Sequence, residues 1–152
     1  GYVLGVCNGF QILTETQLVP GALLHNASHK FICKNVYLTP VSPLSPMTAD
    51  LPESGIYKIP IAHGEGRYFA DEATLKSLND QGQVMFRYCE ADGAITDAAN
   101  PNGAVQNIAG VCNAGRNVMG MMPHPERAAD ANLLNTDGLA LFHSVLNHMV
   151  TA

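Results

Sequence analysis

Residues 2–9 constrain the fold of this chain more than any other part of its sequence. Residues 2–6 are apolar throughout, as in a strand that is buried on both faces in a parallel sheet. From Gly9 to Leu18 the apolar residues follow helical spacing instead, and a Pro-Gly pair then ends that pattern. The chain therefore opens with a strand, a tight turn and a helix, and the turn contains Cys7.

The rest of the chain mixes strand and helix patterns. Strands are predicted at 31–41, 56–62, 83–89, 108–112 and 118–122, and the last two form a hairpin across the loop 113–117. Pro60 places the second of these strands at a sheet edge, or ends it there. Residues 41–52 are rich in Pro and Ser and predict a loop. The pattern indicates an α/β fold with a mixed sheet.

Two helices are predicted after the opening one. Asp71 is expected to cap a short helix that runs to Leu78. The last helix is expected to start from a cap at Thr136 or Asp137. Its buried stripe is predicted to consist of Leu139, Phe142, Leu146 and Met149.

Length and charge limit the classes of function. A chain of 152 residues suits one domain, residues 1–152. Its formal net charge is -5 and it has no basic run, which argues against nucleic acid as a partner. No apolar stretch approaches the ~18–20 residues that cross a bilayer, so no membrane is expected. The N-terminus lacks the charged start of a signal peptide, and a cytoplasmic location is expected.

The four cysteines show no C-x-x-C spacing, so neither a metal site nor a redox motif is predicted. Cys33, Cys89 and Cys112 each lie in an apolar, strand-like segment and are expected to be small buried hydrophobic residues. Cys7 differs from them because it lies in a turn between two glycines.

A nucleophile on a sharp strand-to-helix turn is held above the sheet, and here G-x-C-x-G is formed by Gly5, Cys7 and Gly9. The glycines are expected to permit a strained backbone and close packing. The helix start favours an anion, which lowers the pKa of such a thiol to about 3.5–7.5. The Asn8 N–H would point toward an oxyanion on an attacked carbonyl. One such donor typically stabilises the transition state by about 2.7–4 kcal/mol. The alternative is a buried cysteine in a glycine-rich turn.

His124 is the best candidate for a base among the six histidines. It follows an apolar strand and has a proline on each side, which excludes a helix at that residue. Glu126 projects to the same side in an extended backbone, where its carboxylate can orient the imidazole. The alternative is a strand end with an incidental histidine and glutamate. The histidines expected to face solvent are His25, His29, His143 and His148.

Together, "GVCNGFQ" (5–11) and "HPE" (124–126) resemble the class I (triad) glutamine amidotransferases. That resemblance implies a flavodoxin-like α/β domain with a mixed, mainly parallel central sheet. Further stretches are similar to the glutaminase subunits of phosphoribosylformylglycinamidine synthases, which are ATP-dependent carbon–nitrogen ligases of purine biosynthesis. These stretches are "NASHKF" (26–31), "PIAHGEGRY" (60–68), "NPNG" (100–103) and "GMMPHPER" (120–127).

The resemblance implies the following catalytic roles. Cys7 attacks the carboxamide of glutamine and forms a glutamyl thioester. His124 moves protons to the leaving ammonia and from the hydrolytic water, and Glu126 orients His124.

The resemblance also implies a substrate-binding set around the turn. This set consists of Gly5, Asn8, Gly9 and Gln11. The Asn8 N–H forms half of an oxyanion hole, while Gln11 either contacts the bound glutamine or is an ordinary helix-surface residue. Residues 26–31 are expected near the amino-acid end of the substrate. His63 is not counted as catalytic, and residues 63–68 are either an ordinary turn or a mobile loop near the synthase interface or ammonia exit.

No phosphate cradle occurs in the sequence, so no cofactor is expected in this chain. The resemblance places ATP and magnesium on a partner synthetase subunit, which would receive the ammonia. Members of the family carry further βα units before the strand of the elbow, and an upstream loop supplies the second oxyanion N–H. The chain is therefore expected to correspond to the C-terminal portion of such a domain.

Three alternative functions remain open from the sequence. The first is another class I amidotransferase that serves a different synthetase. The second is a γ-glutamyl thiol hydrolase that acts without a partner. The third is a catalytically inert interaction module or fragment.

Overall fold

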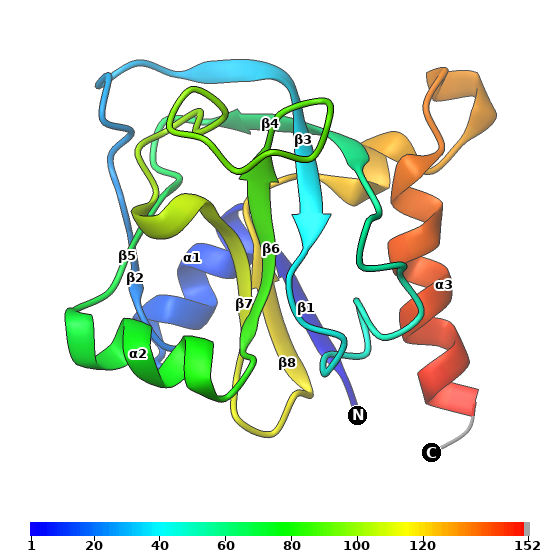
Figure 1. The fold of residues 1–152 in the computed structure, drawn as a ribbon, viewed down its shortest axis with the longest axis horizontal. Coiled ribbons are helices and arrows are strands. Elements are labelled where there is room, and N and C mark those ends of the chain that lie inside the picture. The colour runs from blue at the N-terminus through cyan, green and yellow to red at the C-terminus, as the bar shows by residue number, and fades with distance from the viewer. Residues whose placement is uncertain (151–152) are drawn as a thin grey trace.

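A six-stranded sheet forms the centre of the fold (Figure 1). The structure is a computed structural model, and it describes residues 1–150. In spatial order the strands are β1 (Val3–Val6), β8 (Val118–Met121), β7 (Ile108–Cys112), β6 (Val84–Cys89), β3 (Ile32–Pro40) and β4 (Tyr57–His63). A separate antiparallel pair consists of β2 (Ala22–Leu24) and β5 (Arg67–Phe69).

Three α-helices accompany the sheet, namely α1 (Asn8–Glu15), α2 (Glu72–Asp80) and α3 (Asp137–Val150). In Figure 1, α1 lies behind the strands and α3 stands at the right-hand side. Short 3₁₀ turns are η1 (Val105–Asn107), η2 (Pro125–Ala128) and η3 (Ala131–Leu133). Within residues 1–150, no helix combines the length and the apolarity that a membrane span requires.

The predicted α/β fold with a mixed sheet is confirmed, but a mainly parallel sheet is wrong for residues 1–150. The pairing of β1 with β8 is parallel. The four other pairings in this sheet, β8–β7, β7–β6, β6–β3 and β3–β4, are antiparallel. The loop 113–117 closes a hairpin, and a hairpin imposes antiparallel neighbours. Among residues 1–150, the parallel pairing is the one that leads directly into Cys7.

The predicted strands and their connections agree closely with the structure. The β7–β8 hairpin and the irregular loop 41–52 are both observed. Pro60 lies in β4, which is an edge strand as predicted. The Asp71 carboxylate accepts the Thr74 N–H at 2.7 Å and so caps α2, which ends two residues beyond the predicted end. Helix α1 ends at Glu15 rather than Leu18, because Gln17 adopts a positive φ of 59°.

Two buried-residue predictions near the sheet are wrong. Val3 is 47% exposed, because β1 lies at an edge of the described sheet rather than between two strands. Cys33 is exposed, since it lies in the exposed first half of β3. Cys89 and Cys112 are buried, as predicted.

The predicted buried stripe of α3 is also wrong. Leu146 and Met149 are 55% and 51% exposed, and Leu139 and Phe142 are only half-buried. The helix instead buries Leu141 and Ser144. The Ser144 hydroxyl donates to the Pro46 carbonyl at 2.6 Å and accepts the Asp50 N–H at 3.1 Å, so the loop 41–52 satisfies a buried polar residue.

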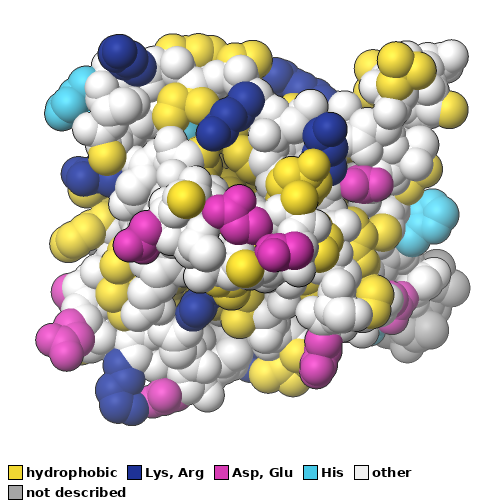
Figure 2. Space-filling view, turned by 45° about the horizontal axis from the view of Figure 1, so that its top comes forward, with side chains coloured by type: hydrophobic (Ala, Val, Ile, Leu, Met, Phe, Trp, Pro, Cys, Tyr) yellow, Lys and Arg dark blue, Asp and Glu magenta, His cyan; other side chains and the backbone are white. Residues whose placement is uncertain are grey.

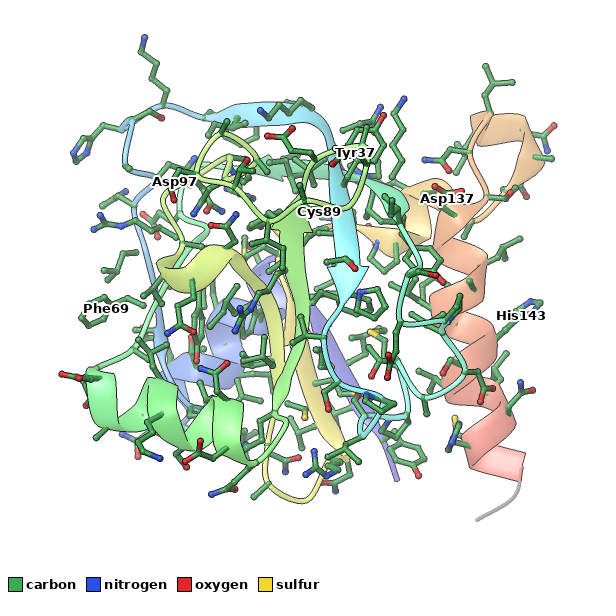
Figure 3. All side chains as sticks on the ribbon, viewed as in Figure 1. Tyr37, Phe69, Cys89, Asp97, Asp137 and His143 are labelled. Carbon is green, nitrogen blue, oxygen red and sulfur yellow. The ribbon has the colours of Figure 1, made fainter. Side chains whose placement is uncertain are left out.

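The side chains on the outside of the fold are of mixed type. Figure 2 shows acidic and basic side chains interspersed with apolar ones on one face, so charge of one sign is not gathered there. His143 points away from the sheet on the outer side of α3, as predicted (Figure 3). His148 is instead half-buried, with its Nδ1 2.9 Å from the Ser144 carbonyl.

Two glycines set the distance between α1 and the sheet. A Cβ on Gly120 would lie 2.1 Å from Cδ2 of the buried Phe10 ring. A Cβ on Gly5 would lie 2.7 Å from the carbonyl carbon of Gly9 in α1. Both positions therefore require a residue without a side chain. Gly9 itself has open space around its Cβ position and is not among the residues with positive φ, so the prediction that it permits strain is wrong.

We predict opposite effects for alanine at two of these glycines. Gly120→Ala should lower the free energy of unfolding by about 1–3 kcal/mol, because the Phe10 ring stacks on Tyr68 with centroids 5.9 Å apart and has no room to retreat. Gly9→Ala should be neutral or stabilising by up to about 1 kcal/mol, since alanine is the better helix former. Urea unfolding followed by circular dichroism measures both. Equal losses in the two variants would contradict this packing.

Candidate active site

Cys7 lies at the junction of β1 and α1 in a strained backbone conformation. Its φ of 53° and ψ of -106° are unusual for a residue with a side chain. Hydrogen bonds hold this conformation on both sides. The Cys7 N–H donates to the Met121 carbonyl at 2.9 Å, and the Cys7 carbonyl accepts the Gln11 N–H at 3.1 Å. The turn is therefore fixed by β8 and by the first turn of α1.

His124 and Glu126 form a directly hydrogen-bonded pair. His124 Nδ1 lies 2.6 Å from Glu126 Oε1, and the ring is buried. A carboxylate only accepts, so Nδ1 carries the hydrogen and the Nε2 lone pair is free to act as a base. The extended backbone that the sequence suggested is wrong, because Glu126 lies in the 3₁₀ turn η2. That turn still brings the carboxylate to the imidazole.

The edge strand β4 fixes the backbone of this pair. The His124 N–H donates to the Pro60 carbonyl at 2.8 Å. Proline has no backbone N–H to donate to a further strand, but its carbonyl can still accept a hydrogen bond. The same proline that marks the strand as an edge therefore holds the histidine beside the end of β4.

A cavity of about 580 Å³ brings the two parts together. Its lining includes Cys7, Asn8, Gln11, His63, His124 and Arg127. The Cys7 thiol contacts the Ala62 carbonyl at 3.8 Å. His124 Nε2 is buried and has no hydrogen-bond partner among residues 1–150. The predicted nucleophile and base thus share one cavity, and Glu126 is bonded to the base.

Burial raises the pKa of the Cys7 thiol, and this effect is the largest one acting on that group. The Asn8 N–H and the Arg127 guanidinium oppose it, while the Glu126 carboxylate adds to it. The expectation that the helix start lowers this pKa overall is therefore wrong, although the Asn8 contribution has the expected sign. A thiol with a raised pKa needs a base to become a nucleophile, and His124 lines the same cavity.

The sequence left two alternatives for Gln11, a contact with the bound glutamine and an ordinary place on the helix surface. Gln11 lines the cavity, and its side-chain amide donates to the Glu65 carbonyl at 2.7 Å. A contact between Gln11 and glutamine remains a prediction. Gly5 and Gly9 contribute backbone only, and the missing side chain of Gly5 lets the backbone of Gly9 approach below Cys7.

His63 is the cavity residue that sequence reasoning set aside. It ends β4, is only 3% exposed and lines the cavity with Cys7 and His124. Burial, with a smaller contribution from the neighbouring His124, lowers the pKa of His63 to about 4. The available signal was its position directly after a predicted strand, in a stretch with glycines at 64 and 66. Arg127, which follows the "HPE" motif, was missed in the same way.

We predict that His63 makes the fold sensitive to acid. A histidine in the unfolded chain takes up a proton near pH 6.5, whereas folded His63 stays neutral down to about pH 4. Its contribution to stability is therefore present above pH 6.5 and is lost as the pH falls. Between pH 7 and pH 5 the free energy of unfolding should fall by about 2 kcal/mol more in the unmodified chain than in the His63→Asn variant. Urea unfolding followed by circular dichroism measures this, as the chain lacks tryptophan. Equal losses would contradict it.

Comparisons with known proteins show which family the chain resembles. The chain is 52% identical over 149 residues to the phosphoribosylformylglycinamidine synthase subunit PurQ of Koribacter versatilis, covering 98% of this chain and 64% of that protein. It is 54% identical over 142 residues to the PurQ subunit of Synechocystis sp., covering 93% and 63%. The chain thus spans a little under two thirds of the length of these curated relatives.

A solved structure is also similar. It is the structure of PurLQS from Thermotoga maritima, with a TM-score of 0.80 and 40% sequence identity, covering 97% of this chain and 62% of that chain. Residues 1–138 match the model of the CobB/CobQ-like glutamine amidotransferase domain. The chain therefore belongs to the CobB/CobQ-like glutamine amidotransferase domain family.

Proposed function

We propose that this chain is the glutaminase part of a phosphoribosylformylglycinamidine synthase. It would hydrolyse glutamine through a cysteine thioester and pass ammonia to an ATP-dependent synthetase. The observation that carries the proposal is the shared cavity of Cys7 and the His124–Glu126 pair, in a chain about half identical to subunits of that name.

In the first half of the reaction, His124 Nε2 takes the proton of the Cys7 thiol as sulfur attacks the carboxamide carbon. The carbonyl oxygen becomes an oxyanion, and the Asn8 N–H at the start of α1 supports it. The carbon–nitrogen bond then breaks, and the imidazolium returns its proton to the leaving nitrogen. The products of this half are ammonia and a glutamyl thioester on Cys7.

In the second half, water attacks the thioester while His124 Nε2 takes a proton from it. The carbon–sulfur bond breaks, the thiol regains a proton, and glutamate leaves. Glu126 keeps the hydrogen on Nδ1 throughout and stabilises the imidazolium that forms in each half. The raised pKa of Cys7 is consistent with these roles, because proton removal is then coupled to attack rather than complete beforehand.

The partner in this proposal is a synthetase subunit in the cytoplasm, which would bind ATP, magnesium and the ribonucleotide amide. The chain itself would bind glutamine and no cofactor. A cavity of about 580 Å³ is of the size class that takes small molecules.

Cys7→Ser tests the proposal in the full natural chain together with its synthetase. We expect glutamine-dependent synthesis to fall by at least about 10³-fold, since the alcohol is a far weaker nucleophile than the thiol. Synthesis from added ammonium salt should keep its normal rate, because ammonia bypasses the cysteine. Both rates are followed as ADP release.

Other outcomes of this experiment separate the alternatives. Loss of both activities would mean that Cys7 has a structural role instead. Retention of both would mean that Cys7 is not the nucleophile. Absence of glutamine-dependent synthesis in the natural chain with its synthetase would favour the inert module. Rapid turnover of γ-glutamyl peptides without any partner would favour a thiol hydrolase, and activation by a different synthetase would favour another amidotransferase.

A further inference from the structure

A buried hydrogen-bond network joins the three sequence motifs that the proposed reaction leaves unused. Asn26, from the "NASHKF" stretch, lies at its centre and is fully buried. Its amide nitrogen donates to the carbonyls of Lys30 and His63, both at 2.8 Å. Since both partners are carbonyls, this end of the side chain must be the NH₂ group. The Oδ1 atom is therefore fixed as an acceptor.

The fixed amide determines the hydrogen position on His63. Asn26 Oδ1 accepts the Gly66 N–H at 3.1 Å and lies 3.1 Å from His63 Nδ1. Because this oxygen only accepts, Nδ1 must carry the hydrogen. The low pKa of His63, about 4, keeps the ring neutral near pH 7. A neutral ring with hydrogen on Nδ1 has its lone pair on Nε2.

Backbone packing holds the ring in place. A Cβ on Gly66 would lie 2.4 Å from the Cε1 and Nδ1 atoms of His63, so the ring occupies the space of a missing side chain. The Gly66 carbonyl accepts from the Asn102 amide at 2.8 Å, and the Asn102 carbonyl accepts the Ala27 N–H at 2.9 Å. The "HGEG", "NPNG" and "NASHKF" stretches thus support one imidazole. Of the two alternatives for residues 63–68, these contacts disfavour a mobile loop.

His63 Nε2 has no partner among residues 1–150, although it is buried. A buried acceptor without a hydrogen-bond partner is unfavourable, which points to a donor that the described chain does not supply. Its ring lines the cavity that also contains Cys7 and His124, and His124 Nε2 likewise lacks a partner in the described chain. Two unpaired ring nitrogens therefore border one cavity. They fit a small, uncharged group with more than one hydrogen to donate, and they disfavour a carboxylate.

We propose that His63 binds the nitrogen that is released at Cys7. Its Nε2 accepts an N–H of the substrate carboxamide and then holds the ammonia after the carbon–nitrogen bond breaks. His63 forms no covalent bond and transfers no proton, and His124 remains the base. This inference rests on the proposed glutaminase function.

The proposal has a consequence for amine nucleophiles. By microscopic reversibility, the place from which ammonia leaves is also the place from which an amine attacks the thioester. Hydroxylamine attacks a glutamyl thioester to give γ-glutamyl hydroxamate and the free thiol, whereas water gives glutamate. The ratio of hydroxamate to glutamate therefore reports how well the nitrogen position is held.

The test measures this ratio in the full natural chain with its synthetase, at a fixed concentration of hydroxylamine. In His63→Asn, the amide keeps a donor at the Nδ1 position for Asn26 but places no acceptor at the Nε2 position. In His63→Gln, the amide reaches the Nε2 position. We expect the ratio to fall about tenfold in His63→Asn, and to recover at least in part in His63→Gln.

A merely structural role of His63 would not move this ratio, because both products come from the same thioester and the amount of active protein cancels. An unchanged ratio in His63→Asn would overturn the inference while leaving the proposed function intact. Absence of both products in the wild type would overturn the proposed function itself.

A second measurement needs no variant. Nitrogen-15 chemical shifts of the histidine rings should show the hydrogen of His63 on Nδ1 at pH 7. Hydrogen on Nε2 would overturn the proposal, because that nitrogen would then have no lone pair to offer.

Discussion

The parallel pairing of β1 with β8 is the contact on which the rest of the site depends. Its register places Val6 opposite Met121, and the next N–H, that of Cys7, bonds to the Met121 carbonyl at 2.9 Å. A one-residue slip would turn the thiol to the other face of the sheet. Gly5 and Gly120 lie opposite each other in this pairing, and both lack the side chain that would push α1 away. Packing and register therefore specify the same position for Cys7.

Burial then determines the protonation states of two groups in the cavity. It raises the pKa of the Cys7 thiol and lowers that of His63, so both groups are uncharged near neutral pH. Glu126 holds one ring with its Nε2 lone pair free, and Asn26 holds the other ring in the same tautomer. In our proposals, the same ring tautomer serves two roles, proton transfer at His124 and nitrogen binding at His63.

Local patterns in the sequence predicted the strand–turn–helix unit, the hairpin and the histidine–glutamate pair. Each of these depends on neighbours within a few residues, which the sequence displays. The strand order did not follow from the sequence, because pairing partners far apart in the chain determine it. The prediction of which face of α3 is buried was wrong for a related reason. Ser144 is buried only because the Pro46 carbonyl, distant in sequence, accepts its hydroxyl hydrogen.

His63 illustrates the same limit at the site. Its chemistry depends on burial and on the orientation of the Asn26 amide, and both are properties of the folded chain. The raised pKa of Cys7 was missed because the helix start is a local feature, whereas the larger effect of burial is not. Spacing indicated which residues carry chemistry, but not their protonation states.

Labelling by a chloroketone analogue of glutamine tests the central claim most directly. In the full natural chain, peptide mapping should find a single label on Cys7, and excess glutamine should prevent it. The exposed thiol of Cys33 should react only with a general alkylating reagent, which makes it an internal control. His124→Ala should slow the labelling of Cys7 by at least about tenfold, because the base is lost. A label on another cysteine, or an unchanged rate in His124→Ala, would contradict the account.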